Sequence, residues 1–295
     1  MSKFGVMVMG PAGAGKSTFC ASLITHLQLN RRSCFYVNLD PAAESFEHTP
    51  DLDIRDLISV EDVMDELKLG PNGGLIYCFE FLMENLSFLE ESLNSVTEEY
   101  LIIFDMPGQI ELYTHYPVLP ALVNFLRSPG NLDIRLCAAY LLESTFVVDR
   151  AKYFAGSLSA LSSMYMLGLP HLNILSKMDL VKDQIRKKDF KKFLVPDTML
   201  IEEDPQEVEA RKAGVDYQPP VESETDALMS GAGFKRLNNA VAQLLENFSM
   251  VHYHKLDCTD EDSVGGILSY IDECIQWAEA QEPKEIPDEE YDDEE

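Results

Sequence analysis

The sequence predicts an α/β fold in which a mainly parallel β-sheet is covered by helices on both faces. Two observations predict this fold. Short apolar runs rich in β-branched or aromatic residues recur along the chain, and each is followed by a segment with helical spacing, which is the alternation of βαβ units. A glycine-rich loop lies between the first run and the helical segment after it, where a helix N-terminus can bind a phosphate group.

The predicted strands, in chain order, are residues 4–10, 33–40, 100–108, 135–143, 173–179 and 250–258. After the fourth strand, Phe154, Leu158, Leu161 and Tyr165 recur at helical intervals and predict the core-facing side of a helix. The length and the 46 % of apolar residues suit one large domain, predicted over residues 1–281. Within it, we predict a helical insertion at about residues 182–235. Residues 282–295 are predicted to form a disordered acidic tail.

The formal net charge is −28, from 23 basic and 51 acidic residues. Direct binding to nucleic acid or to anionic membranes is disfavoured, because both need clustered lysine and arginine. A basic protein partner fits the charge better. The basic run 186–192 favours a solvated helix face over a recognition patch. The six cysteines form no C-x-x-C pair, which disfavours a zinc site or a disulfide framework. With no signal-peptide pattern and no apolar run of membrane-spanning length, we expect a soluble intracellular protein.

Residues 10–18, GPAGAGKST, match the phosphate-loop pattern G-x-x-x-x-G-K-[ST], with a strand before them and a helix after them. The glycines allow backbone N–H groups to wrap a phosphate, and the helix dipole adds positive potential. Lys16 offers a charge to the terminal phosphates, and Ser17 offers a hydroxyl to Mg²⁺. The fold class is therefore predicted more narrowly as a three-layer P-loop NTPase fold.

Residues 104–111, FDMPGQIE, follow the third predicted strand. Asp105 ends that strand, where a carboxylate can hold Mg²⁺ through water, and the unhindered N–H of Gly108 could meet a γ-phosphate. Gln109 and Glu111 could orient an attacking water. This segment favours nucleotide hydrolysis.

Residues 175–179, LSKMD, end a later strand. The Asp179 carboxylate can accept hydrogen bonds from both N1–H and the exocyclic amine of guanine, a contact that adenine cannot make. The Lys177 stem would pack over the base. Ser176 stands where the usual N-K-x-D motif has asparagine.

Two further segments are weak signals when each is taken alone, because each sequence also suits an ordinary turn. Residues 38–44, NLDPAAE, place Asp40 near the expected phosphate site, and residues 70–74, GPNGG, separate a helix-like stretch from an apolar run. In the order found here, all these motifs together resemble the GPN-loop GTPases of the SIMIBI class of P-loop proteins, over roughly residues 3–280. Within that family the chain is most similar to the third, shorter eukaryotic paralogue, which ends in a similar acidic tail.

The resemblance implies a role for each motif residue. A loop of Gly70, Pro71 and Asn72 would reach across a dimer, bringing the asparagine to the partner's γ-phosphate. The other implied groups are phosphate and Mg²⁺ ligands (Gly13, Ala14, Gly15, Lys16, Ser17 and Thr18), residues around the metal and the attacking water (Asp40, Asp105, Gly108, Gln109 and Glu111), and residues of the base-binding loops (Ser176, Lys177, Asp179 and Cys258). The implied ligands are GTP or GDP with Mg²⁺.

The resemblance also implies partners: a homodimer or a heterodimer with a paralogue, and RNA polymerase II subunits as clients in assembly and nuclear import. The expected location is the cytoplasm, with shuttling to the nucleus. One alternative is a nucleotide-gated, chaperone-like adaptor with little turnover. Another is a P-loop kinase, which the single arginine in the run 186–192 disfavours, because kinase lids are usually rich in arginine.

Overall fold

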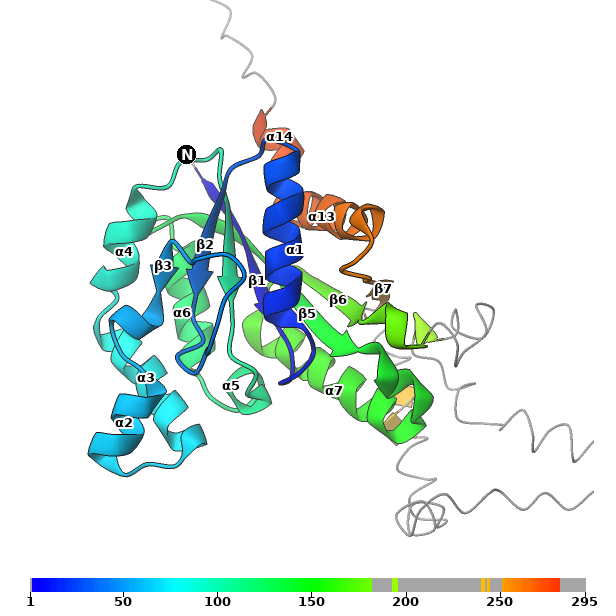
Figure 1. The fold of residues 1–295 in the computed structure, drawn as a ribbon, viewed down its shortest axis with the longest axis horizontal. Helices are drawn as coiled ribbons and strands as arrows, with labels where there is room; N and C mark the ends of the chain where they lie inside the picture. Colours follow the sequence, from blue (N-terminus) through cyan, green and yellow to red (C-terminus); the bar gives the residue numbers. More distant parts are fainter. Residues whose placement is uncertain (1, 182–192, 196–239, 242, 245–250, 282–295) are drawn as a thin grey trace, which may run out of the picture.

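The computed structural model of the chain describes residues 2–181, 193–195, 240–241, 243–244 and 251–281. The strands in this part form one seven-stranded sheet of order β3-β2-β4-β1-β5-β6-β7, in which neighbouring strands are parallel (Figure 1). They are β1 (Lys3–Met9), β2 (Cys34–Asn38), β3 (Leu52–Asp53), β4 (Leu101–Asp105), β5 (Ile134–Glu143), β6 (His171–Ser176) and β7 (Tyr253–Lys255).

Helices cover both faces of this sheet. On one face lie α1 (Lys16–Leu29), α13 (Glu261–Ile275) and the short α14 (Trp277–Gln281). The other face is covered by α2 (Val60–Leu67), α3 (Pro71–Glu84), α4 (Ser87–Asn94), α5 (Ile110–Thr114), α6 (Val118–Arg127) and α7 (Arg150–Leu167). Short 3₁₀ turns are η1 (Ile54–Asp56), η2 (Ser144–Val148) and η3 (Met178–Val181).

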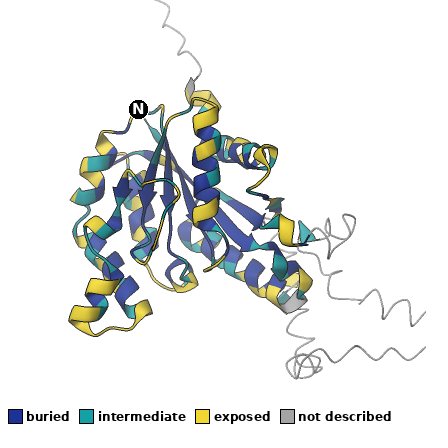
Figure 2. Ribbon diagram, in the orientation of Figure 1, coloured by how far each residue is buried: buried dark blue, intermediate teal, exposed yellow. Residues whose placement is uncertain are grey.

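The central strand β1 shows why the sheet forms the middle layer. Phe4, Val6 and Val8 point into the core beneath α1 and α13, whereas Met7 and Met9 point into the core on the opposite face. All five side chains are buried, and Figure 2 shows the sheet as the buried layer between helices with exposed outer faces. A strand buried on both faces reads as a continuous apolar run, which explains the sequence of this element.

The order of the strands also indicates at which edge of the sheet a ligand would bind. The chain runs from β1 to β2, returns through β4, and then crosses to β5 on the other side of β1. Ligands of open α/β sheets bind beyond the carboxyl ends of the strands at such a reversal. The carboxyl end of β1 leads directly into residues 10–15, so the predicted phosphate loop lies at this point.

All six predicted strands are confirmed, and the two-residue β3 was not predicted. The predicted apolar side of the helix at 154–165 is only half right. Phe154 and Leu161 are buried in α7, but Leu158 and Tyr165 are 39 % and 83 % exposed. Leu158 and Tyr165 instead line an open apolar groove together with Pro170 and His171. The prediction that these two side chains face the core is therefore wrong.

The GPN segment is not a separate loop. Gly70 is the N-cap of α3, Pro71 is its first residue, and the N–H of Gly74 donates to the carbonyl of Gly70 at 2.8 Å. Proline suits this position, because the first helical N–H has no partner within the helix.

Apart from residues 193–195, the predicted insertion of about 182–235, with its basic run 186–192, lies outside the described residues, and so does the acidic tail. In the described ranges, no helix has both the length and the apolar character needed to cross a membrane.

Candidate nucleotide-binding site

The loop between β1 and α1 has a backbone that only glycine adopts easily. Gly10, Gly13 and Gly15 have φ values of +136°, +78° and +87°. At Gly10, a β-carbon would lie 2.2 Å from the carbonyl oxygen of Leu141, so this position also excludes a side chain by contact. Helix α1 begins after Gly15 with no side-chain cap. Its first N–H groups therefore have no partner within the helix, and they suit an anion.

Three charged side chains meet beside this loop: Lys16, Asp40 and Asp105. Lys16 is 8 % exposed, and its ammonium group donates to the carbonyl of Pro11 at 3.3 Å. Burial lowers the pKa of Lys16, while Asp105 and Asp40 raise it. Burial raises the pKa of Asp105, the Ser17 hydroxyl and Lys16 lower it, and Asp40 raises it further. The buried Asp105 and the half-buried Asp40 beside one lysine leave an excess of negative charge.

This carboxylate pair fits a divalent cation. Asp105 Oδ1 is buried and has no hydrogen-bond partner, and the Ser17 hydroxyl lies close enough to lower the Asp105 pKa. Carboxylate and hydroxyl oxygens are the ligands that Mg²⁺ prefers. Among the described residues, no group of three or more histidine, cysteine, aspartate or glutamate side chains could hold a metal. Mg²⁺ at Ser17, Asp40 and Asp105 would therefore share its coordination with phosphate and water.

A cavity of about 240 Å³ joins the phosphate loop to the segment after β4. Lys16, Asp40, Gly108, Gln109 and Pro71 line it, together with Ala12, Gly13, Ala42, Val60 and Leu75. A β-carbon at Gly108 would lie 2.8 Å from Ala12 Cα, so the D-x-x-G turn touches the phosphate loop itself. The predicted catalytic glutamine and the phosphate-binding lysine thus face one space.

The loop after β6 lies against the other side of the phosphate loop. The Ser176 hydroxyl donates to the carbonyl of Ala14 at 2.6 Å, so serine braces the loop at the position where the usual motif has asparagine. Lys177 has φ +55°, and its Cε lies 3.7 Å from where a Gly15 β-carbon would be. The Lys177 ammonium pairs with Glu143 at 3.2 Å, and the Ser144 hydroxyl donates to the Lys177 carbonyl at 2.7 Å.

Asp179 and Cys258 also come together at this edge. The N–H of Met178 donates to the carbonyl of Leu256 at 3.2 Å, which joins the loop after β6 to the loop after β7. Burial raises the pKa of Cys258, and the nearby charge of Asp179 raises it further. Asp179 itself is exposed, so its carboxylate is accessible to a ligand.

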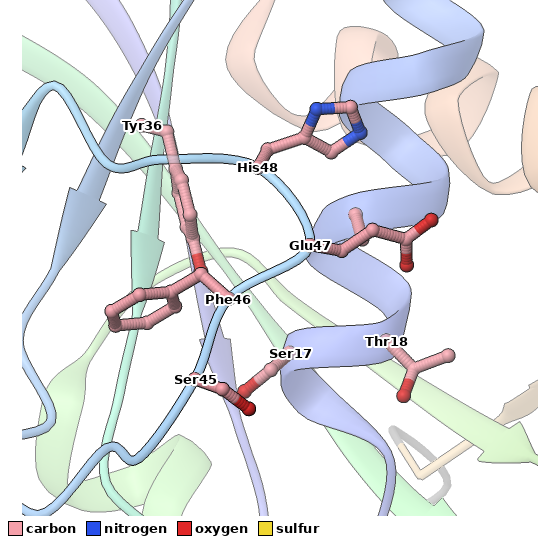
Figure 3. A pocket seen from close by; sticks show the side chains of 8 residues that line it. Ser17, Thr18, Tyr36, Ser45, Phe46, Glu47 and His48 are labelled. Atoms are coloured by element: carbon pink, nitrogen blue, oxygen red, sulfur yellow. The ribbon is translucent and has the colours of Figure 1, made fainter.

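Several predicted site residues do not line the 240 Å³ cavity, and Asn72, Glu111 and Thr18 are three of them. Asn72 and Glu111 are both exposed and do not line it, although the structure describes both. Thr18 lines a different cavity of about 150 Å³, which also includes Ser17, Tyr36 and residues 45–48 (Figure 3). In the single chain, only Pro71 of the GPN segment reaches the cavity that holds Lys16 and Gln109.

The site includes side chains that sequence reasoning missed. The Tyr36 hydroxyl donates to Asp105 Oδ2 at 3.2 Å, and the buried Tyr113 hydroxyl donates to the carbonyl of Pro107. The Asn38 side chain accepts from the Asp40 N–H at 3.0 Å, and Glu143 pairs with Lys177. Both tyrosines read as core residues in the sequence. Asn38 and Glu143 did carry a signal, since each is a polar residue at the carboxyl end of a buried parallel strand.

The fold and this site define a P-loop nucleotide-binding protein. A family model described as "conserved hypothetical ATP binding protein" matches residues 8–277. Curated proteins named "GPN-loop GTPase 3" are 68 % identical in Gibberella zeae, 63 % in Aspergillus fumigatus and 51 % in Saccharomyces cerevisiae. Each alignment covers 98 % of this chain and 97–98 % of the relative. The chain therefore belongs to the GPN-loop GTPase family.

A solved structure supports the fold independently. An apo-form GTPase from Pyrococcus abyssi matches with a TM-score of 0.63 at 21 % identity, over 92 % of this chain and 97 % of that one. At this level of identity the match concerns the fold alone. It confirms the predicted α/β architecture.

Proposed function

We propose that this chain is a dimeric, GTP-dependent switch that acts in the assembly and nuclear import of RNA polymerase II. As a member of the GPN-loop GTPase family, it binds guanine nucleotide and hydrolyses GTP. The observation that carries the chemistry is the cavity shared by Lys16, Asp40, Gly108 and Gln109, because it brings phosphate-binding and water-orienting groups into one space.

The chain's own residues divide the reaction into binding and positioning. Lys16 and the N–H groups of the phosphate loop would hold the β- and γ-phosphates. Gly108 lies against Ala12 of the phosphate loop, with no room for a side chain, and its N–H could meet the γ-phosphate. Gln109 would orient a water for in-line attack on that phosphate. When bound by Ser17, Asp40 and Asp105, Mg²⁺ would neutralise charge on the phosphates.

Guanine selectivity is assigned to the loops after β6 and β7. The exposed Asp179 would accept from N1–H and the exocyclic amine of guanine, and Lys177 would pack its stem on the base. The contact of Lys177 with Gly15 supports this assignment, since base and phosphates belong to one ligand.

A dimer is supported by apolar surface around the cavity. Leu69 precedes the GPN segment and is 38 % exposed, and Ile110 follows Gln109 and is 39 % exposed. Leu67, Tyr77 and Tyr116 are exposed on the neighbouring helices or just beyond them. Pro71 and Gln109 line the same cavity, so Leu69 and Ile110 flank it. A second copy or a paralogue would bury these side chains and could bring its Asn72 to this cavity.

The cellular role rests on family resemblance. RNA polymerase II subunits are the proposed clients, and the proposed location is the cytoplasm with passage to the nucleus. A net charge of −28 favours basic surfaces on a client and disfavours direct contact with nucleic acid or membranes.

One experiment tests the biochemical part of the proposal. The purified protein is measured by light scattering, its bound nucleotide is identified by chromatography, and its hydrolysis of GTP and ATP is compared with Mg²⁺ present. We expect a dimer, guanine nucleotide and GTP turnover. Guanine binding without turnover would favour the adaptor alternative, and bound adenine nucleotide would contradict the assignment of Asp179.

A further inference from the structure

The loop between β2 and β3 carries Asp40, and its shape decides where that carboxylate lies. The Asp40 N–H donates to the Asn38 side chain at 3.0 Å, and its Oδ1 accepts from the Ala42 N–H at 3.0 Å. Asn38 also donates to Asp53 Oδ1 at 2.8 Å. The turn at Asp40 is thus attached to the strand that follows the loop.

Arg55, in η1, makes contacts with both ends of this arrangement. Its Nε donates to Asp53 Oδ1 at 3.1 Å and its Nη2 donates to Asp53 Oδ2 at 2.6 Å, so the guanidinium and the carboxylate form a forked pair. Its Nη1 donates to the Ala43 carbonyl at 2.8 Å. The guanidinium carbon also lies 4.7 Å from the centre of the Phe46 ring. One side chain therefore fixes the loop at two points beyond Asp40.

The same contacts extend to the second carboxylate. The Phe46 ring packs edge-on against Tyr36, with centroids 6.1 Å apart, and the Tyr36 hydroxyl donates to Asp105 Oδ2 at 3.2 Å. Figure 3 shows residues 45–48 passing beside α1, with Tyr36 and Phe46 close together and Ser45 near Ser17. Arg55 is connected to both carboxylates without lining the 240 Å³ cavity.

We propose that Arg55 is a positioning residue, which holds the loop of residues 40–46 so that Asp40 and Asp105 face Ser17 in a geometry that binds a divalent cation. The inference rests on the proposed GTPase function, and it adds the residue that orders the metal ligands. Lysine cannot replace it, because only guanidinium can make a forked pair, a third hydrogen bond and a ring contact at once.

The test uses Arg55→Lys in the full chain, with a matched arginine as control. Arg32 makes the same kind of contacts at the other end of α1: a forked pair with Asp272 at 2.7 and 2.8 Å, and a ring contact with Trp277 at 3.8 Å. Both variants keep the charge and lose the fork. A comparison of the two variants separates an effect on the metal-binding site from the general effect of replacing a paired arginine.

The first readout is binding of Mn²⁺ to the GDP-bound protein, followed by the electron paramagnetic resonance signal of the free ion. We expect Arg55→Lys to weaken Mn²⁺ binding about tenfold, which is typical when an outer-shell partner of a metal ligand is changed. Arg32→Lys should bind Mn²⁺ as the wild type does. Phe46→Leu, which removes the ring but keeps the apolar volume, should weaken Mn²⁺ binding by a smaller factor.

The second readout is GTP turnover. We expect kcat of Arg55→Lys to fall about tenfold with KM for GTP little changed, because Lys16 and the phosphate loop are intact. Mn²⁺ binding and kcat that are equal in Arg55→Lys and Arg32→Lys would overturn the inference. A wild-type protein without GTP turnover would instead overturn the proposed function, while Mn²⁺ binding would still decide the role of Arg55.

Discussion

Lys16 and Gln109 line the same cavity but are expected to act at different stages of the reaction. The Lys16 ammonium group is buried and has the Pro11 carbonyl at 3.3 Å as an acceptor. Burial lowers the pKa of Lys16, and the charges of Asp105 and Asp40 oppose that change. Gln109 lines the same cavity but carries no charge. A charge that neutralises phosphates stabilises the bound ground state, whereas a neutral group that orients water matters mainly in the transition state.

This difference predicts distinct effects for two variants. Lys16→Ala should abolish tight GTP binding. Gln109→Leu should bind GTP with near wild-type affinity but reduce kcat by about 10²-fold, the scale of one catalytic group. Fluorescent-nucleotide titration and single-turnover hydrolysis measure the two quantities. If both variants lost affinity to the same extent, Gln109 would be a binding residue and not a water-positioning one.

Asp179 carries a second prediction at this scale. Its carboxylate is exposed beside the loop that holds Cys258, and an amide in its place presents a donor where guanine presents an amine. Asp179→Asn should therefore shift preference from guanine to xanthine nucleotides, whose ring carries a carbonyl at that position. Competition binding with GTP and xanthosine triphosphate measures the shift. An unchanged preference would remove Asp179 from the base site.

At the scale of elements, the site depends on two loops that touch. A β-carbon at Gly108 would lie only 2.8 Å from Ala12 Cα, which is too close. Gly108→Ala must therefore push the D-x-x-G turn away from the phosphate loop. We expect weaker GTP binding and slower turnover. Gly266→Ala in α13 is the matched control, because nothing lies within 4 Å of its β-carbon position and alanine favours helix, raising the free energy of unfolding by about 0.5–1 kcal/mol. Thermal unfolding and GTP titration of both variants check this prediction; equal GTP affinity would contradict it.

The elements that the sequence predicted well share a physical reason. β1, β4 and β5 are buried on both faces, so each reads as an apolar run with a turn after it. β3 has only two residues and therefore no pattern to read. The apolar residues after Asn72 were read as a run without a fixed structure, but they continue α3 from Pro71 to Glu84. Proline is common both in turns and at the first position of a helix, so Pro71 marks the start of α3 only when the residues after it are known to be helical.

The same limit applies to the site. The placement of Lys16, Asp105 and Lys177 at one edge of the sheet was predictable, because their motifs follow strands whose carboxyl ends meet there. Arg55 acts on a loop that begins at Asp40, 15 residues earlier, through a carbonyl and a ring. No short spacing encodes such contacts, because they depend on the path of the loop in space.

At the scale of the whole molecule, the single chain brings together its phosphate-binding residues and Gln109 but leaves Asn72 exposed. If Asn72 is only a surface residue at the start of α3, Asn72→Ala should leave hydrolysis intact and change the free energy of unfolding by about 0.5 kcal/mol or less. If it serves the partner's site, the variant should fold and bind GTP yet lose hydrolysis. A mixture of two inactive variants distinguishes these roles.

We expect Asn72→Ala and Gln109→Leu to be inactive separately and partly active when mixed. In a symmetric dimer that exchanges Asn72, a mixed dimer has one site with its own Gln109 and the partner's Asn72 both intact, while the other site carries both defects. Hydrolysis should therefore rise in proportion to the fraction of mixed dimers, which differently tagged chains allow to be measured by sequential affinity capture. If Asn72 acted within its own chain, each site of a mixed dimer would carry one defect, and the mixture would stay inactive. Inactivity with mixed dimers demonstrably present would thus assign Asn72 to its own chain or to no catalytic role.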